Sequence, residues 1–491
     1  MRSLKPLLLI LWPLILAAAP PATAPFPLVI SKQTTWIEAP LLPDGTIDYP
    51  AYLREVPAVP ASADAAPLLQ ESLAAWQPFQ DHALDPATHI RITNALDGLA
   101  ATLWSSAEHP DVADWLHQND AAFALLDQAS RLPALALVLD DATSARIETL
   151  ARALLTRAGQ RAAAGDHDAA RADAATLFRF ARLLQPLRHH EASALAGIID
   201  NDVFRLALVD CRSASPPERQ HWLDLLRSTS DVPLAIGAFD ADRCATLDSI
   251  MPAFRGNPVA ALQPLISVPS PRPAITAALR QTDLASVDWN VVLRLVNRQH
   301  DHFIDLLRKP SLDRLDELRD FSRDIGDLPA PFGPADSLRR DAAVGLPAPV
   351  NPAPAPDPLA TLHNFLRREP HESTPAFSTR VAAYFLQADA GSYRYVAGGD
   401  LMTRAWRRLH IVAIASLIYR DRIGHFPDRL EDLALPADLT TDPFSNEPLF
   451  FFRPDPDRLT LYSVGHNRQN DGGIPQAHAG DSTDDIPLTL P

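Results

Sequence analysis

Apolar residues recur at helical spacing through most of the middle of the chain. The clearest stripe follows i, i+3, i+4, i+7 and i+11 and consists of Ile147, Leu150, Ala151, Leu154 and Ala158. This spacing places the five side chains on one face and predicts a helix that begins near Thr143.

The next stripe consists of Ala170, Ala174, Leu177, Ala181 and Leu184. Between the two stripes, Gly165 is a helix stop, and Asp166 or Asp168 is the cap of the following helix. The pattern predicts an αα-hairpin, which locally resembles a tetratricopeptide unit. Since no 34-residue period recurs around it, we expect a looser stack of helix pairs. Further helices are predicted at Val112 to Leu126, His189 to Val209, Pro217 to Ser228 and Asp288 to Arg308.

The pattern changes near the C-terminus. Thr403 to Leu433 predicts a strongly apolar helix, a stop at Gly424 and a second, short helix. Leu449 to Phe452 and Leu459 to Val464 predict a β-hairpin joined by a Pro/Asp turn. The fold class expected is mainly α, with stacked helical hairpins and a small C-terminal α+β domain.

Composition shifts divide the chain of 491 residues. The expected parts are a signal peptide or N-terminal anchor (1–24), an extended arm (25–63), a helical domain (64–328), a Pro-rich linker (329–358) and a C-terminal region (359–491). The linker has nine prolines in thirty residues. A hydrophobic fraction of 47% is enough to bury sizeable cores. The net charge of −16 argues against nucleic acid as a partner.

The N-terminal segment predicts export. Arg2 and Lys5 precede an apolar run from Pro6 to Ala19, which is short for a membrane span and suits a signal peptide. Cleavage or retention as an anchor is open, and membrane contact is expected only through this segment. We expect a periplasmic, envelope or extracellular location. In such a compartment Cys211 and Cys244 either pair or remain two separate buried thiols.

The C-terminal region resembles the globular part of the major pseudopilins of type II secretion systems. The resemblance covers about residues 403–486. It rests on a helix followed by Tyr419, Gly424 to Pro427, Asp442 to Phe444 and Tyr462 to Gly465. It implies a small antiparallel sheet and a Ca²⁺-binding loop, with Ser463, Gly465, Asn467, Gly472, Gly473, Asp485 and Ile486 at the matching positions.

The chain also departs from that family. Asn467 stands where the family tends to have Asp, and Asp471 is displaced to the position before the glycines. The N-terminus lacks the prepilin-peptidase site, so assembly into a pilus by the usual route is not expected. The arm from Thr34 to Tyr49, the segment Val112 to Ser130 and the αα-hairpin resemble a group of large exported bacterial proteins, a resemblance that implies architecture and no activity.

The C-terminal loop carries the candidate chemistry. Calcium takes about six to eight oxygen ligands from carboxylates, amides and carbonyls. Asp471 and Asp485 are the first candidate ligands, and Asn467 and Asp484 are the second. The alternative is a solvated acidic tail with ordinary turns.

Other candidate chemistry is weaker. His189–His190 and His300–His302 point to different helix faces, and we interpret both pairs as polar faces of surface helices. Ser463 precedes His466 but falls on a predicted strand. Tryptophans in predicted helices are interpreted mainly as core anchors; they are Trp104, Trp115, Trp222, Trp289 and Trp406.

The function expected is that of a non-enzymatic exported protein that acts in interaction or scaffolding, with a protein partner and a C-terminal loop stabilised by Ca²⁺. The alternatives are an exported enzyme with a site in the helical domain and a secretion-system accessory protein. A cleft with clustered, perturbed acids and histidines favours the enzyme.

Overall fold

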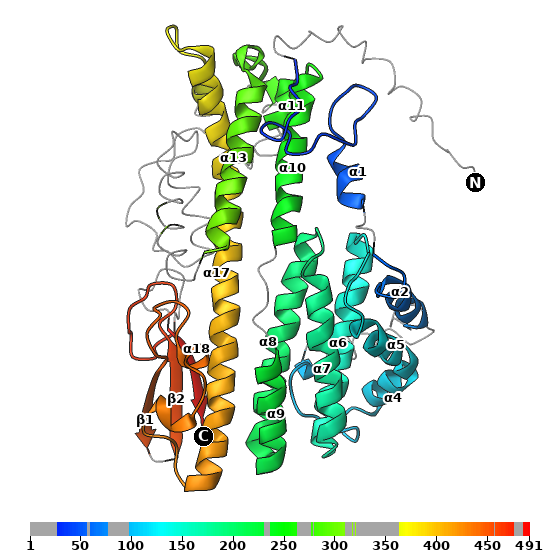
Figure 1. Cartoon of the computed structure of the whole chain (residues 1–491), viewed down its shortest axis with the longest axis vertical. Coiled ribbons are helices and arrows are strands. Elements are labelled where there is room, and N and C mark those ends of the chain that lie inside the picture. The colour runs from blue at the N-terminus through cyan, green and yellow to red at the C-terminus, as the bar shows by residue number, and fades with distance from the viewer. Residues whose placement is uncertain are drawn as a thin grey trace, which may run out of the picture.

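A computed structural model describes residues 27–55, 59–76, 98–229, 236–262, 276–309 without 278, 317, 320, 363–455, 457–475 and 485–491. The N-terminal apolar segment, the Pro-rich segment 329–358 and Asp484 lie outside these residues. The protein is mainly helical and has a small antiparallel sheet at its C-terminus (Figure 1). Among the described residues, no helix has the length and apolar character that crossing a bilayer requires.

The described helices are α1 (Tyr49–Arg54), α2 (Ala66–Ala75), α4 (Pro110–Gln118), α5 (Asp120–Ser130), α6 (Asp141–Ala163), α7 (His167–Leu184), α8 (His190–Ser213), α9 (Pro216–Ser228), α10 (Ile236–Phe254), α11 (Pro258–Leu262), η2 (Leu284–Ser286), α13 (Trp289–Leu307), α17 (Thr374–Ile423), η3 (Leu430–Leu433) and α18 (Ala437–Thr440). The strands are β1 (Phe450–Asp455), β2 (Arg458–Ser463) and β3 (Ile486–Leu490).

The predicted αα-hairpin is confirmed as α6 and α7, and its ends follow from local chemistry. Asp140 caps α6 by accepting a hydrogen bond from the Thr143 N–H at 2.7 Å. Gly165 ends it with a φ of 78°, a left-handed conformation in which glycine has no steric cost. Asp166 then caps α7 through the Ala169 N–H. Every residue of both predicted stripes is buried.

The predicted helix from Val112 to Leu126 is wrong as a single element. The chain forms α4 and α5, with the break at Asn119. Asn119 is fully buried and its side-chain amide donates to the Trp115 carbonyl at 3.0 Å. An Asn side chain that bonds nearby backbone competes with the helical hydrogen bonds, so the helix stops there.

The long helix α17 begins at Thr374, well before the predicted start at Thr403. Ser373 caps it by accepting a hydrogen bond from the Ala376 N–H, and Pro375 fits its first turn. Gly391, Gly398 and Gly399 lower the intrinsic helix propensity of this stretch. The sequence pattern therefore did not predict the first part of the helix. The predicted stop at Gly424 is confirmed, with a φ of 90°.

Two hydrophobic cores share α17. The first core lies between α2, α4 to α9, the C-terminal part of α17 and the sheet, and includes Leu154, Phe204, Leu409 and Leu461. The second core lies between the N-terminal arm, α10, α11, α13 and the N-terminal part of α17. In Figure 1, α17 runs beside α13 at one end and beside α8, α9 and the sheet at the other.

The N-terminal arm is bound to α13 by two asparagine side chains. Asn290 accepts from the Val29 N–H and donates to the Pro27 carbonyl, both at 2.8 Å. Asn297 donates to the Lys32 carbonyl at 2.7 Å. The side-chain amides therefore hydrogen-bond the arm's backbone, and the arm contributes Tyr49 to the second core.

Several sequence interpretations change with burial. His300 is buried rather than on a surface face, and burial lowers its pKa to about 3, while His302 is exposed. Trp104 is buried but lies outside the helices, and its indole N–H donates to the Thr156 carbonyl at 2.8 Å. The cysteines are two separate thiols, Cys211 in the first core and Cys244 in the second.

The sheet has the order β1-β2-β3 and is antiparallel throughout. The predicted hairpin is confirmed, with Phe450 opposite Tyr462 and Phe452 opposite Thr460. β3 pairs with β2 along its whole length, from Leu459 opposite Leu490 to Ser463 opposite Ile486. The chain between β2 and β3 contains the candidate loop.

Candidate functional site

The loop after β2 turns sharply where the sequence has glycines. Gly465, Gly472 and Gly473 have φ values of 65°, 74° and 79°. At Gly473 space matters as well as conformation, because a Cβ there would lie 3.3 Å from Cδ1 of Tyr462. Glycine therefore lets the loop pass directly over the sheet's aromatic side chains.

Asp485, at the start of β3, holds this loop against the sheet. It is buried, and its Oδ2 accepts hydrogen bonds from the backbone N–H groups of Asp471 at 3.1 Å and Gly473 at 2.7 Å. Asn467 adds a side-chain contact, since its Nδ2 donates to Oδ2 of Asp471 at 2.8 Å. Three of the four predicted ligands are thus brought together.

The donor chemistry of this cluster fits a hard cation. Asp471 and Asp485 supply carboxylates and Asn467 supplies an amide oxygen, which are groups that Ca²⁺ accepts. Within the residues that the structure describes, no group of three His, Cys, Asp or Glu side chains is placed to hold a metal ion. A calcium ion here would therefore need backbone carbonyls or further ligands in addition to the two carboxylates.

Asp442 links the Asp-Pro loop to the end of β2. The residue is fully buried, and its Oδ1 accepts from the Ser463 hydroxyl at 2.8 Å and from the Phe444 N–H at 2.9 Å. Its Oδ2 accepts from the Val464 N–H at 2.8 Å. Burial raises the pKa of Asp442, and these hydrogen bonds oppose that rise. Ser463 is thus a hydrogen-bond donor to a buried carboxylate, while the His466 ring packs on Phe444.

A histidine between two acids lies in the helical stack, and sequence reasoning missed it. His167 Nδ1 is 3.1 Å from Oδ2 of Asp210, and its Nε2 is 3.3 Å from Oε1 of Glu218. Trp222 donates to the same Asp210 oxygen at 2.6 Å. The acids are 43 and 51 positions away in sequence, so no local signal could identify them. Since both ring nitrogens face carboxylates, neither is directed at a substrate position.

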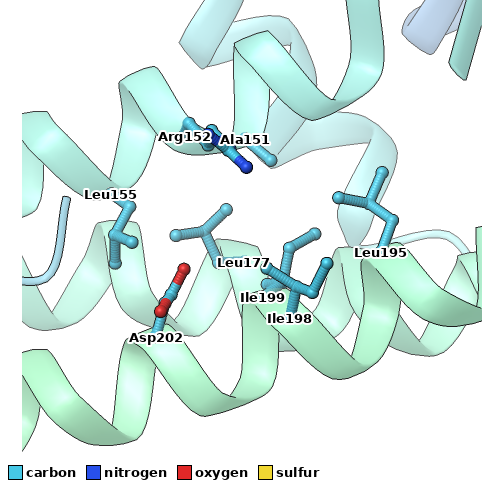
Figure 2. A pocket seen from close by; sticks show the side chains of 8 residues that line it. All are labelled: Ala151, Arg152, Leu155, Leu177, Leu195, Ile198, Ile199 and Asp202. Carbon is cyan, nitrogen blue, oxygen red and sulfur yellow. The ribbon is translucent and has the colours of Figure 1, made fainter. Parts of the chain in front are cut away.

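Two hollows lie on the helical stack. The first, between α6, α7 and α8, is a mainly aliphatic pit of about 10 Å³ with Arg152 and Asp202 at its edge (Figure 2). Burial raises the pKa of Asp202. This space suits about one water molecule and no larger ligand. The second is a groove between α5, α6 and α7 with a volume of about 370 Å³.

The acids in the groove are paired with arginines. The enzyme alternative expects acids clustered with histidines, and there is no histidine among the described residues that line this groove. Asp173 is buried, with Nη2 of Arg157 at 2.7 Å and Nη1 of Arg161 at 2.9 Å. Burial still raises the pKa of Asp173, because desolvation outweighs the attraction of both guanidiniums. Asp127 accepts from Arg131 and Arg179.

Comparisons with protein-family models, with curated proteins and with solved structures give no match.

Proposed function

We propose that this chain is an exported, non-enzymatic interaction or scaffolding protein whose C-terminal pseudopilin-like module binds Ca²⁺ in the loop between β2 and β3. The observation that carries the proposal is the meeting of Asn467, Asp471 and Asp485 at the base of that loop. Asp471 and Asp485 bring two carboxylates into one loop, and a divalent cation would neutralise their charge.

Two of the motifs that carry the resemblance, Asp442 to Phe444 and Tyr462 to Gly465, are hydrogen-bonded to each other, which supports a pseudopilin-like module. Asp442 belongs to the Asp-Pro motif, and its carboxylate accepts hydrogen bonds from Ser463 and Val464 of the strand motif. It also accepts one from Phe444 in its own loop. The order of α17, Gly424, η3, the Asp442 loop and the hairpin also agrees with the expected order.

Scaffolding is supported by α17. This helix has 50 residues and contributes to both hydrophobic cores, so it joins the two ends of the molecule with continuous backbone hydrogen bonds. A helix of this size extends about 75 Å. Export is supported by the apolar run from Pro6 to Ala19.

The test is thermal unfolding of the full chain in EGTA and in millimolar Ca²⁺. The full chain is needed because the sheet shares the first core with the helical stack. A ligand that binds only the folded state raises the unfolding midpoint, by about 2.7 kcal/mol of stability at 100 times its dissociation constant. Mg²⁺ is the comparison ion, because it demands a tighter octahedral site.

Matched variants locate the effect. Asp471→Asn and Asp485→Asn keep the side-chain size, and we expect both to abolish the Ca²⁺ response. Asp457→Asn is the control, since Asp457 is exposed at the turn between β1 and β2. A Ca²⁺ response that survives in both loop variants, or no response in the unmodified chain, would refute the calcium site.

A further inference from the structure

The groove between α5, α6 and α7 has the size and the charges of a binding site. Its volume of about 370 Å³ lies within the range of about 300–1,000 Å³ that is usual for small-molecule pockets. It is lined by side chains from all three helices, with Asp127 on α5, Arg157 and Arg161 on α6, and Asp173 on α7.

Arg157 is fixed in the wall of the groove. Its guanidinium lies over the Phe123 ring, 4.2 Å from the centroid. Its Nη1 is 2.7 Å from Oδ1 of Asp120, and its Nε and Nη2 bind the two oxygens of Asp173 at 3.1 and 2.7 Å. Because all three nitrogens are hydrogen-bonded and one face lies on Phe123, the guanidinium has little freedom to reorient and its positive charge is fixed in position.

Arg161, one helical turn further, has spare donor capacity. Only its Nη1 engages Asp173, at 3.0 and 2.9 Å from the two carboxylate oxygens. The Nε and Nη2 groups of Arg161 are not used by that carboxylate. The side chain is 31% exposed and lines the groove, so these donors are accessible from solvent.

The local charge is positive in a protein that is acidic as a whole. The lining of the groove contributes three arginines (Arg131, Arg157, Arg161) and three aspartates (Asp120, Asp127, Asp173). Arg179, which is outside the lining, binds Asp127 and leaves the whole cluster with one net positive charge. The whole chain has a net charge of −16. A single excess charge is balanced by a monoanion, whereas a phosphate group of about −1.5 to −2 would leave uncompensated negative charge beside three carboxylates.

We propose that this groove binds a small molecule with one carboxylate group, and that the Nε and Nη2 groups of Arg161 are its principal donors. A guanidinium edge presents two parallel N–H groups, which match the two oxygens of a planar carboxylate. This site is separate from the C-terminal loop and depends on neither Ca²⁺ nor the pseudopilin resemblance.

The experiment is isothermal titration calorimetry of the full chain at low ionic strength. The probe is N-acetylalanine, which has one carboxylate and a small apolar part. N-acetylalaninamide is its uncharged match, and inorganic phosphate is the competing anion. We expect N-acetylalanine to bind more tightly than either of the other two. Equal binding of the amide, tighter binding of phosphate, or no measurable binding of N-acetylalanine would overturn the proposal.

Two variants test the residue. Arg161→Gln removes the charged donors, and we expect about tenfold or greater weakening of N-acetylalanine binding, as for the loss of a charge-assisted hydrogen bond. Arg152→Gln is the control: Arg152 lies on the same helix, is paired with Glu148 and lines the pit of Figure 2 instead of the groove. Its affinity should equal that of the unmodified chain.

Arg161 also binds Asp173, so the fold of the variant must be checked by circular dichroism. If Arg161→Gln does not fold, Arg161→Lys replaces it, because Lys keeps the charge beside Asp173 and loses the planar pair of donors. We expect Arg161→Lys to weaken N-acetylalanine binding. Unchanged affinity in a folded Arg161 variant would assign the binding to another residue and refute the proposal.

Discussion

Buried carboxylates are stabilised differently in the helical stack and in the C-terminal module. In the stack, arginines bind them: Arg182 holds the fully buried Asp200 at 2.7 and 2.8 Å, and Arg157 and Arg161 hold Asp173. In the module, backbone N–H groups and a hydroxyl bind Asp442, and two backbone N–H groups bind Oδ2 of Asp485.

The difference reflects what each architecture can supply. Helices satisfy their own backbone groups except at the ends, so a carboxylate between helices needs a side-chain partner. Loops at the end of a small sheet have unpaired N–H groups that can converge on a carboxylate. The first arrangement depends on single side chains, while the second depends on backbone conformation.

The largest effect is expected from Arg182→Met. This change leaves Asp200 buried beside an apolar side chain, and we expect a loss of about 3–5 kcal/mol in the free energy of unfolding. Urea denaturation of the full chain measures it. Arg308→Met is the control, because Arg308 and Asp305 form an exposed pair that contributes at most about 1 kcal/mol. Equal effects of the two changes would contradict the importance of the buried pair.

In the module, Asp442→Ala should cost about 3 kcal/mol, since three buried donors lose their acceptor and each unsatisfied group costs at least about 1 kcal/mol. Ser463→Ala removes one of these donors and should cost less. Chemical denaturation checks the order of the two variants. A smaller loss for Asp442→Ala than for Ser463→Ala would show that the backbone donors find other acceptors.

Asp200 should also give a pH dependence. Burial raises its pKa to about 6 from an ordinary value of 3.8. The folded state then binds the proton more tightly than the unfolded state, so stability falls as pH rises from about 4 to about 6. The effect is about 2–3 kcal/mol. Asp200→Asn removes this pH dependence. Subtracting the variant's free energy of unfolding from that of the unmodified chain at each pH isolates the contribution of Asp200.

Comparing curves matters because buried histidines act in the opposite direction. Burial lowers the pKa of His410 to about 4, so its contribution is lost as pH falls from about 6.5 to about 4. His410 is present in both proteins and cancels in the difference. A flat difference curve between pH 4 and 6 would mean that Asp200 keeps an ordinary pKa.

The smallest effect is expected from Gly473→Ala, which alters a backbone donor to Asp485 without touching the carboxylate. The residue has a φ of 79°, and an added Cβ would meet the Tyr462 ring. We expect a loss of about 1–2 kcal/mol. Gly45→Ala is the control for the positive φ alone, because nothing lies within 4 Å of the added Cβ there. Equal losses would show that the close approach to Tyr462 has no cost.

The parts of the fold that the sequence predicts depend on local signals. Asp166, Gly165 and the apolar stripes define α6 and α7 without reference to the rest of the chain. The break at Asn119 was missed because it depends on a buried amide that bonds its own helix. The first half of α17 was missed because packing of Phe377 and Phe385 in the second core outweighs its glycines.

The candidate sites divide in the same way. Asp471 and Asp485 were predicted from oxygen-bearing side chains clustered among glycines, and the pseudopilin resemblance supported that choice. The structure joins them through a hydrogen bond from the Asp471 backbone N–H to the Asp485 carboxylate. The pairing of Asp442 with Ser463 spans 21 positions, and Arg157 reaches Asp120 across 37. Contacts at that separation exist only once the helices and strands have packed, so no local pattern reports them.

The sharing of α17 by both cores determines when the chain can finish folding. Helices α8, α9 and α13 pack directly against α17, a helix that ends at Ile423, late in a chain of 491 residues. During synthesis, both cores therefore remain open until residues 374–423 have left the ribosome. A chain in that state keeps apolar surface exposed and is a natural client for chaperones.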